Sequence, residues 1–395
     1  MSQGLVHGLY AALVGLLGLL GAPLPLVFAL LFAYMAWLGL RPVAPRAGVE
    51  PLTLPGGASE EERIQAVDDW LEDLADAREF HGGVLIARAG VPLLMRTYGV
   101  ADPTTGRPLA TSTPFRLASV SRQFTAAAVL TLVRDGRLEL DQEVAPLLPG
   151  LPYPGVTVRH LLDQTSGIPD RVQDLARKRR SALGGRLRVA DVPRLLGEAR
   201  LRGRRTPGAR HADSGTDYVL AAAVVEAVSG TSFEAYLRKF LFEPLGMANS
   251  RVWTRESEDA FSERALDFAL LPDGGRTALK PAWFECVAGD DGVFASLEDL
   301  LAWERFWREP RLVPAELVRE CFRAPTLASG EASIHGFGWT LDPDGAQQSG
   351  ARLGTRACVA RGSSGASWLA VVECSSSLRA LEVELNLRLL LRTLD

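Results

Sequence analysis

Few side chains in this sequence have a type and spacing typical of catalysis or metal binding, and most of the candidates are isolated along the chain. The four cysteines are far apart and form no Cys-x-x-Cys pair. This spacing excludes a zinc ribbon, a thioredoxin-like redox site and a disulfide-dense secreted scaffold. The five histidines show no spacing typical of metal ligands. We therefore expect neither a metal nor a cofactor, and serine becomes the residue type to examine.

Ser119 begins a helical pattern that runs through QFTAAAVLTLVRDG and ends at Gly136. The string around it, FRLASVSRQFTAAAVLTLVRDGRLELDQEVAPLLP (115–149), is followed by VTVRHLLDQTSGIPD (156–170). Further characteristic strings are TPGARHADSGTDYVL at the start of 206–250, GVFASLEDLLAW (292–303) and GFGWTL (336–341).

These strings resemble the serine β-lactamase and penicillin-binding-protein family, in the branch that contains class C β-lactamases, D,D-peptidases and related esterases. The resemblance covers most of residues 60–395 in the expected order. It implies an α/β (α+β) fold, with an antiparallel sheet flanked by helices and a helical subdomain. The residue pattern agrees, because strands are expected at both ends of this region and helices between them.

The resemblance also implies a catalytic arrangement. A serine hydroxyl is a poor nucleophile until a base takes its proton. The family uses a Ser-x-x-Lys turn, a Tyr-x-Asn motif and a Lys/His-Thr/Ser-Gly strand, with two backbone N–H groups as the oxyanion hole. Ser119 matches the nucleophile, but Arg122 stands at the lysine position. Arginine has a pKa above about 12 and cannot act as a base near neutral pH.

The second motif also differs from the family's Tyr-x-Asn pattern. Asp213 stands at the tyrosine position and Gly215 at the asparagine position. We hypothesise that Asp213 and Arg122 form an ion pair across the active centre, because a buried unpaired arginine would be costly. The alternative is that Arg122 points to solvent or to another carboxylate. His211 matches an apolar family position and is expected to alternate away from the site, so it is a weak candidate for a substitute base.

The third motif reads Gln348-Ser349-Gly350, which keeps the hydroxyl and the glycine but lacks the basic group. The resemblance implies that these residues and Ala351 would contact a substrate, with the backbone near Ala351 contributing to the oxyanion hole. With the base, the phenol and the amide all replaced, we predict a pseudoenzyme whose cleft binds a small-molecule or peptide ligand or a partner. The alternatives are an active esterase, amidase or peptidase that uses Ser119 with an unfamiliar base, and a scaffold with a filled cleft.

The first forty residues form a separate region. No charged side chain occurs from Gly8 to Leu40, and Gly21, Pro23 and Pro25 interrupt this apolar run. We predict a membrane anchor in residues 1–41, inserted through residues 5–40 as a hairpin or a kinked helix. A buried hairpin in a soluble core is the alternative. The arginines that follow the run place the main domain on the cytoplasmic side by the positive-inside rule.

Residues 42–58 are rich in proline and glycine and are predicted to be a linker to the domain at 59–395. Within that domain, residues 171–210 carry a net charge of +10, although the whole chain carries −4. Anionic lipid or an acidic partner could bind this segment. A solvated helical face is the alternative, and nucleic acid is not expected because no aromatic residues interleave the arginines.

Overall fold

The computed structural model describes residues 49–54, 56–199, 205–254, 261–271, 275–280, 287–309, 311–352, 354–375 and 379–394. These residues belong to one compact unit, Ala47–Asp395. The anchor predicted for residues 1–41 lies outside the described residues. Among the described residues, none of the helices combines the length and the apolar character needed to cross a bilayer.

A seven-stranded antiparallel sheet forms the centre of the fold, with the strand order β2-β1-β12-β11-β10-β9-β8. The first and last strands of the domain lie side by side in this order, since β1 pairs with β12 along its whole length. The strands are β1 (Gly82–Arg88), β2 (Val91–Tyr98), β8 (His335–Gly336), β9 (Trp339–Asp342), β10 (Gly345–Arg352), β11 (Thr355–Gly362) and β12 (Ser367–Glu373).

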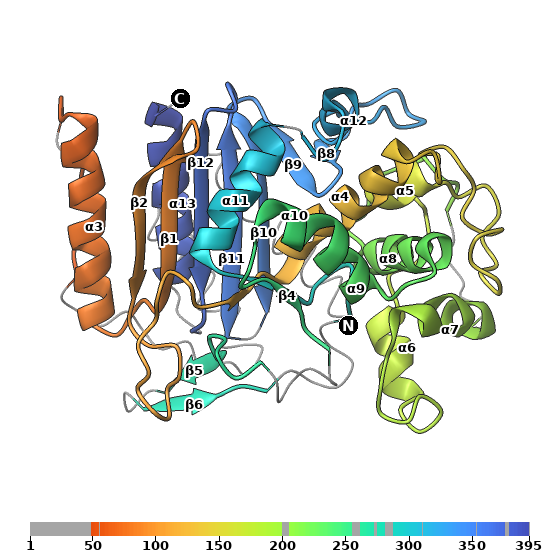
Figure 1. Cartoon of the computed structure of the whole chain (residues 1–395), viewed down its shortest axis with the longest axis horizontal. Coiled ribbons are helices and arrows are strands. Elements are labelled where there is room, and N and C mark those ends of the chain that lie inside the picture. Colours follow the sequence, from red (N-terminus) through yellow and green to blue (C-terminus); the bar gives the residue numbers. More distant parts are fainter. Residues whose placement is uncertain are drawn as a thin grey trace. The chain divides into compact units, whose positions relative to one another are not determined.

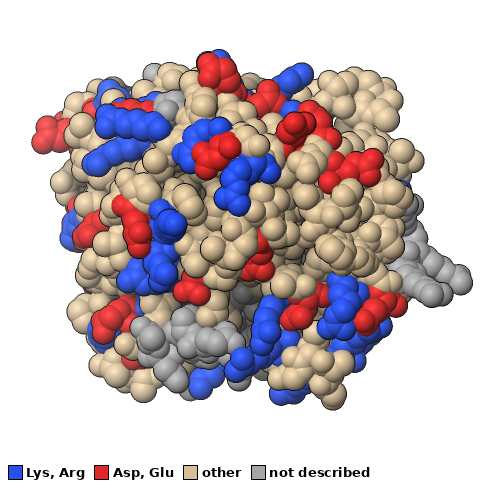
Figure 2. Space-filling view, turned by 45° about the vertical axis from the view of Figure 1, so that its right-hand side comes forward, with Lys and Arg blue, Asp and Glu red and all other residues tan. Residues whose placement is uncertain are grey.

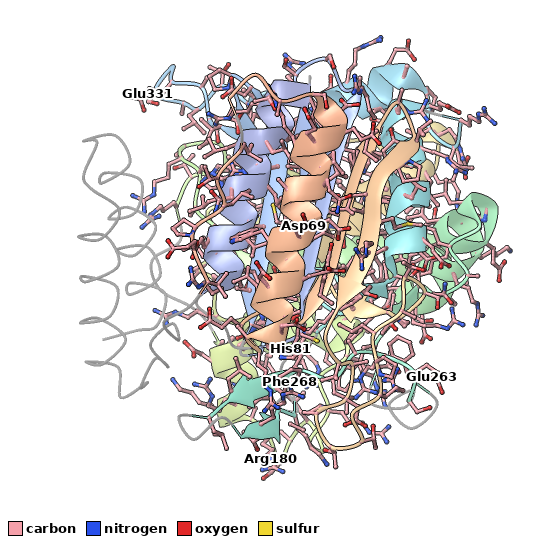
Figure 3. All side chains as sticks on the ribbon, turned by 90° about the vertical axis from the view of Figure 1, so that its left-hand side faces the viewer. Asp69, His81, Arg180, Glu263, Phe268 and Glu331 are labelled. Carbon is pink, nitrogen blue, oxygen red and sulfur yellow. The ribbon has the colours of Figure 1, made fainter. Side chains whose placement is uncertain are left out.

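Helices cover both faces of the sheet. Helices α3 (Glu60–Asp76) and α13 (Arg379–Leu394) lie side by side on one face, as Figure 3 shows. Their apolar sides share one core cluster with the strands beneath them, in which Trp70 and Leu387 are buried. Helix α11 (Leu297–Arg308) contacts β1 and β12 and covers the other face (Figure 1). A capping box between Ser59 and Glu62 fixes the start of α3.

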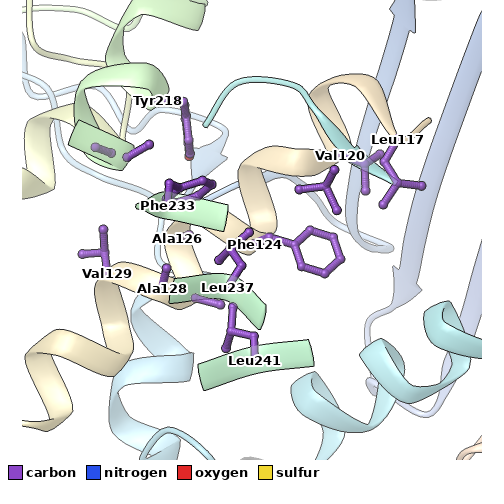
Figure 4. Packing of buried hydrophobic residues seen from close by; sticks show 14 of the residues in the cluster. Leu117, Val120, Phe124, Ala126, Ala128, Val129, Tyr218, Phe233, Leu237 and Leu241 are labelled. Atoms are coloured by element: carbon purple, nitrogen blue, oxygen red, sulfur yellow. The ribbon is translucent and has the colours of Figure 1, made fainter. Parts of the chain in front are cut away.

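A helical subdomain lies beyond the β8–β10 side of the sheet (Figure 1). Its centre is the contact between the buried helices α4 and α8, whose small residues let the two backbones approach closely. Figure 4 shows Phe124, Tyr218 and Phe233 within this packing. The helices are α4 (Ser121–Arg134), α5 (Val158–Leu162), α6 (Val172–Lys178), η2 (Val189–Asp191), α7 (Val192–Ala199), α8 (Gly215–Ser229), α9 (Phe233–Leu237), the π-helical turn η3 (Arg238–Phe242) and α10 (Glu243–Leu245).

Two smaller sheets complete the described fold. Strand β7 lies between β3 and β4, and β5 pairs with β6. The remaining elements are the turn η1 (Ala118–Val120), α12 (Ala315–Glu320), β3 (Phe115–Arg116), β4 (Arg251–Val252), β5 (Phe268–Leu270), β6 (Arg276–Ala278) and β7 (Val293–Ala295). The predicted mixed α/β fold, with an antiparallel sheet, flanking helices and a helical subdomain, is therefore confirmed.

The end of the predicted linker contacts the domain. Val49, Leu52 and Leu54 pack against the core cluster under α3 and α13. The indole N–H of Trp70 also donates to the Glu50 carbonyl at 3.1 Å. Residues 49–54 therefore contact the folded domain.

Candidate active site

Ser119 lies in the short turn η1, between strand β3 and helix α4. The residue before it, Ala118, has a φ of 44°, an uncommon backbone conformation for a residue other than glycine. The Leu117 N–H holds this turn in place by donating to the Val293 carbonyl at 3.0 Å. Backbone strain of this kind is maintained only where the surrounding structure enforces it, and it concentrates at functional sites.

Strand β10 passes directly beside Ser119. A Cβ atom added to Gly350 would lie 2.3 Å from the Ser119 backbone nitrogen, so only glycine permits this approach. This contact places the Gln348-Ser349-Gly350 motif next to the nucleophile position, as the resemblance implies. The Ser349 hydroxyl, however, donates to Glu384 Oε1 at 2.6 Å, on helix α13. Ala351 follows in the same strand and pairs with Arg356 of β11.

Arg122 is buried and lies between two carboxylates. Its Nη1 donates to Asp213 Oδ1 at 2.6 Å, and its Nε donates to Asp290 Oδ1 at 2.8 Å. Burial opposes the guanidinium charge, but the two carboxylates outweigh burial and hold the pKa of Arg122 well above its ordinary value. The predicted ion pair between Arg122 and Asp213 is present, and Arg122 has no capacity to accept a proton from Ser119.

Asp290 was not anticipated from the sequence, and it explains the glycine in the second motif. A Cβ atom added to Gly215 would lie 2.7 Å from Asp290 Oδ2 and 2.9 Å from its Cγ. The Asp290 carboxylate therefore occupies the space that an asparagine side chain at position 215 would need. The GDDG string at 289–292 supplied a signal, since paired acids in a largely apolar surrounding require cationic partners.

Asp290 connects the cleft to a buried network of charges. Its Oδ2 accepts from Arg352 Nη2 at 3.0 Å, and Arg352 Nε donates to Asp291 at 3.1 Å. Asp291 also accepts from Arg116 Nη2 at 2.7 Å. Burial alone would raise the pKa of Asp291, but Arg116 and Arg352 lower it to about 2. At the far end Arg116 reaches Asp267, whose pKa burial raises to about 6.

A cavity of about 230 Å³ opens above Ser119 and Arg122. Its walls come from η1, α4, the turn after α5, the start of α8 with the segment before it, and the region of strands β8 to β10. The lining consists of Ser119, Arg122, Gln164, Asp213, Tyr218, His335, Gly336, Gly338, Trp339, Thr340, Gln347, Gln348 and Ser349. Of the predicted site residues, the structure thus brings Ser119, Arg122, Asp213, Gln348 and Ser349 around one cavity. Gly215, Gly350 and Ala351 are not among the lining residues.

Two stacked histidines lie at this cavity, and one of them lines it. The rings of His211 and His335 stack with centroids 3.7 Å apart and 6° between their planes. His211 Nε2 lies 3.0 Å from Gln164 Oε1. Burial lowers the pKa of His211 to about 4 and also lowers the pKa of His335, so both imidazoles are neutral near pH 7. His335 lines the cavity, whereas His211 is not among the lining residues and contacts two of them, His335 and Gln164.

The only tyrosine among the described lining residues cannot replace the missing phenol. The Tyr218 hydroxyl donates to the Leu162 carbonyl at 2.7 Å and accepts from the Gly338 N–H at 2.7 Å. Its ring faces Arg122, whose guanidinium carbon lies 5.4 Å from the ring centroid. Burial raises the pKa of Tyr218 above its ordinary value. Tyr218 therefore fixes the backbone around the cavity instead of exchanging protons within it.

The basic segment at 171–210 includes α6, η2 and α7, and two of its acidic residues pair with arginines of the same segment. Asp174 pairs with Arg171 and Arg177, and Glu198 pairs with Arg194 at 3.0 Å. Figure 2 shows blue and red side chains interleaved over the lower part of the face turned toward the viewer.

The described residues contain no group of His, Cys, Asp or Glu side chains arranged to hold a metal ion.

Comparison with known proteins decides the family. The family model described as Beta-lactamase matches residues 67–372. The chain belongs to the beta-lactamase family. This beta-lactamase-family chain is 31% identical to penicillin-binding protein 4* of Bacillus subtilis over 282 residues, which is 68% of this chain and 61% of that protein. It is 32% identical to the esterase EstB of Burkholderia gladioli over 310 residues, which covers 70% of this chain and 77% of EstB.

A solved structure supports the fold independently. The penicillin-binding protein from Bacillus halodurans superposes with a TM-score of 0.68 at 22% identity, covering 84% of this chain and 99% of that one. This chain spans about three-fifths of the length of penicillin-binding protein 4*. Family membership and fold are thereby established, whereas the activity has to be argued from the residues of the cleft.

Proposed function

We propose that this beta-lactamase-family protein is a pseudoenzyme, whose cleft binds a ligand without efficient turnover. The observation that carries the proposal is the state of Arg122, which is charged, buried and bonded to two carboxylates. Ser119 then has no base at the family's lysine position, and a serine without a base is a weak nucleophile. In other serine hydrolases, loss of the catalytic side chains leaves only about 10³–10⁴-fold acceleration over water.

The cavity supports a binding role over that of a scaffold with a filled cleft. About 230 Å³ of space remains beside Ser119, and it is lined mostly by polar groups. Such a site can orient the polar end of a ligand through hydrogen bonds. The cavity lies where the relatives of this chain would hold the reacting group, so binding there does not require a new surface.

Residual hydrolysis is the second candidate function, and His335 is the observation that favours it. Its neutral imidazole lines the same cavity as Ser119 and has a ring nitrogen that can accept a proton. Hydrolysis of p-nitrophenyl acetate separates the two candidates. The pseudoenzyme proposal predicts equal rates for the full chain and for Ser119→Ala. A rate that falls at least tenfold in Ser119→Ala and also in His335→Phe would instead establish the serine hydrolase.

We further propose that residues 5–40 attach the chain to a membrane, with the main domain on the cytoplasmic side. The uncharged run from Gly8 to Leu40 supports the attachment, and the arginines after it support the orientation. Fractionation of cells that express the full chain tests this proposal. Recovery in the membrane pellet after a high-salt wash, with the domain open to protease only in lysed cells, is the expected result. Recovery in the soluble fraction would contradict it.

The basic segment at 171–210 is proposed to bind anionic lipid headgroups next to such an anchor. Its net charge of +10 supports this proposal, since each basic residue near an anionic surface contributes about 1 kcal/mol. The test is binding of the full chain to vesicles with and without phosphatidylserine. Binding that does not depend on the anionic lipid would contradict the proposal.

A further inference from the structure

The charges that surround Arg122 form a hydrogen-bonded chain with one more carboxylate than guanidinium. From the cleft inward, the order is Asp213, Arg122, Asp290, Arg352, Asp291, Arg116 and Asp267. Negative and positive groups alternate along this order, so each guanidinium lies between two aspartates. Both ends of the chain are aspartates, and one negative charge is left over.

The two ends differ in their surroundings. Asp267 is buried, and burial raises its pKa to about 6, so it is ionised near pH 7 and the chain keeps its one excess negative charge. The side chain of Asp213 is 77% exposed, and Arg122 lowers its pKa. Asp213 therefore stays ionised, and it is the one aspartate of this hydrogen-bonded chain that lines the cavity.

One oxygen of Asp213 is available for a ligand. Oδ1 accepts the hydrogen bond from Arg122 Nη1, whereas Oδ2 accepts no hydrogen bond from any described residue. An exposed carboxylate oxygen with no protein donor is normally solvated by water. A ligand that replaces this water has to supply a hydrogen-bond donor, because an ionised carboxylate is an acceptor only.

The described part of the cleft offers no free cation to an anionic ligand. Arg122 is the only arginine or lysine among the lining residues, and its charge is shared between Asp213 and Asp290. The position that carries a basic group in the family motif is Gln348. Besides Asp213, the remaining polar lining side chains are uncharged: they are amides, hydroxyls, the Trp339 indole and the neutral His335. A ligand carboxylate placed here would meet the negative charge of Asp213 without compensation.

We propose that the cleft recognises a ligand through a primary ammonium group, which binds Oδ2 of Asp213 and continues the alternation of charges. This inference deepens the proposed binding function and rests on it. An ammonium carries three N–H donors, which suits one carboxylate oxygen and the amide carbonyls of Gln164 or Gln348. The cavity of about 230 Å³ is smaller than the 300–1,000 Å³ typical of drug-sized ligands, so it takes the amine end of a ligand.

Three compounds with one skeleton test this recognition. They are phenylalaninamide, which is cationic, N-acetylphenylalaninamide, which is neutral, and N-acetylphenylalanine, which is anionic. Their affinities for the full chain are measured by calorimetry at pH 6.5, below the pKa of about 7.7–8.0 of an α-amino group. We expect phenylalaninamide to bind at least tenfold tighter than N-acetylphenylalanine, with a preference that shrinks as salt is added.

Asp213→Asn should remove this preference, because the amide keeps the shape and loses the charge. Asp141→Asn is the matched control, since the Asp141 side chain is 74% exposed, accepts from Arg159 Nε at 2.8 Å and does not line the cavity. The control should keep the tenfold preference. The comparison of the three compounds on the unmodified chain stands by itself if the Asp213 variant does not fold.

Several results would overturn the inference. They are equal or tighter binding of the anionic compound, no binding of any of the three compounds, or a preference that survives in Asp213→Asn. Failure of the proposed function would look different. Release of phenylalanine from phenylalaninamide that depends on Ser119 would show turnover and leave the ammonium recognition intact, whereas a preference for the anion without turnover would contradict the recognition alone.

Discussion

Asp290 bonds both to Arg122, which pairs with Asp213 in the cleft, and to Arg352 of the buried network. Its removal should therefore destabilise the whole domain. Asp290→Ala removes the bond of 2.8 Å from Arg122 Nε and the bond of 3.0 Å from Arg352 Nη2. Breaking a buried ion pair by deleting one partner costs about 3–5 kcal/mol. Arg122 keeps Asp213 and Arg352 keeps Asp291. We therefore expect the lower end of that range, a loss of about 3 kcal/mol in the free energy of unfolding.

Urea denaturation of the full chain, followed by tryptophan fluorescence near pH 7, measures this loss. Asp141→Ala is the control, because it breaks an exposed pair with Arg159 and should cost no more than about 1 kcal/mol. Unchanged denaturant slopes are needed for the comparison. If Asp290→Ala and Asp141→Ala destabilise the chain equally, Asp290 does not hold the two arginines and the description of the network is wrong.

Three further predictions follow from the same geometry. Arg122→Lys should not restore hydrolysis, because a lysine at this position would stay protonated between the same two carboxylates. Ester hydrolysis by this variant above the rate of Ser119→Ala would contradict this prediction. Burial lowers the pKa of His211 from 6.5 to about 4, so the unfolded chain binds a proton in this window that the folded chain does not, and stability falls as the pH falls through it. His211→Phe should therefore lose less stability than the unmodified chain between pH 7 and pH 5, as urea denaturation at each pH would show. Gly350→Ala should lower the free energy of unfolding by about 1–3 kcal/mol, because the added Cβ would lie 2.3 Å from the Ser119 backbone nitrogen. Gly56→Ala is the control: its Cβ would have nothing within 4 Å, so it should change the free energy of unfolding by less than about 0.5 kcal/mol.

The sequence predicted the fold well because its signals are local and ordered along the chain. Apolar periodicity and caps mark the long helices: the string SLEDLLAWERFWR (296–308) has its apolar residues at helical spacing and forms α11, with Ser296 as the N-cap. The apolar string ASWLAVVEC, near the end of the domain, contains β12. Short elements were harder to place, since SIHGFGWTLD contains two strands, β8 and β9, with a tight turn at Gly338.

The site was predictable only in part. The ion pair between Arg122 and Asp213 followed from charge balance, because each residue stood at a position expected to face the same centre. Asp290 could not be placed in this way, since it lies 168 residues after Arg122 and pairs with it only through the tertiary fold. The stacking of His211 on His335 has the same origin, because their partnership depends on where β8 packs against the segment before α8.

The reactivity of Ser119 toward covalent probes is the most direct test of the pseudoenzyme proposal. The full chain and Ser119→Ala should be treated with a fluorophosphonate and with a fluorescent penicillin, and labelling should be read by intact mass. The buried, doubly paired Arg122 predicts that neither probe adds mass to a folded chain. Stoichiometric labelling of the unmodified chain that disappears in Ser119→Ala would show an activated nucleophile and contradict the proposal.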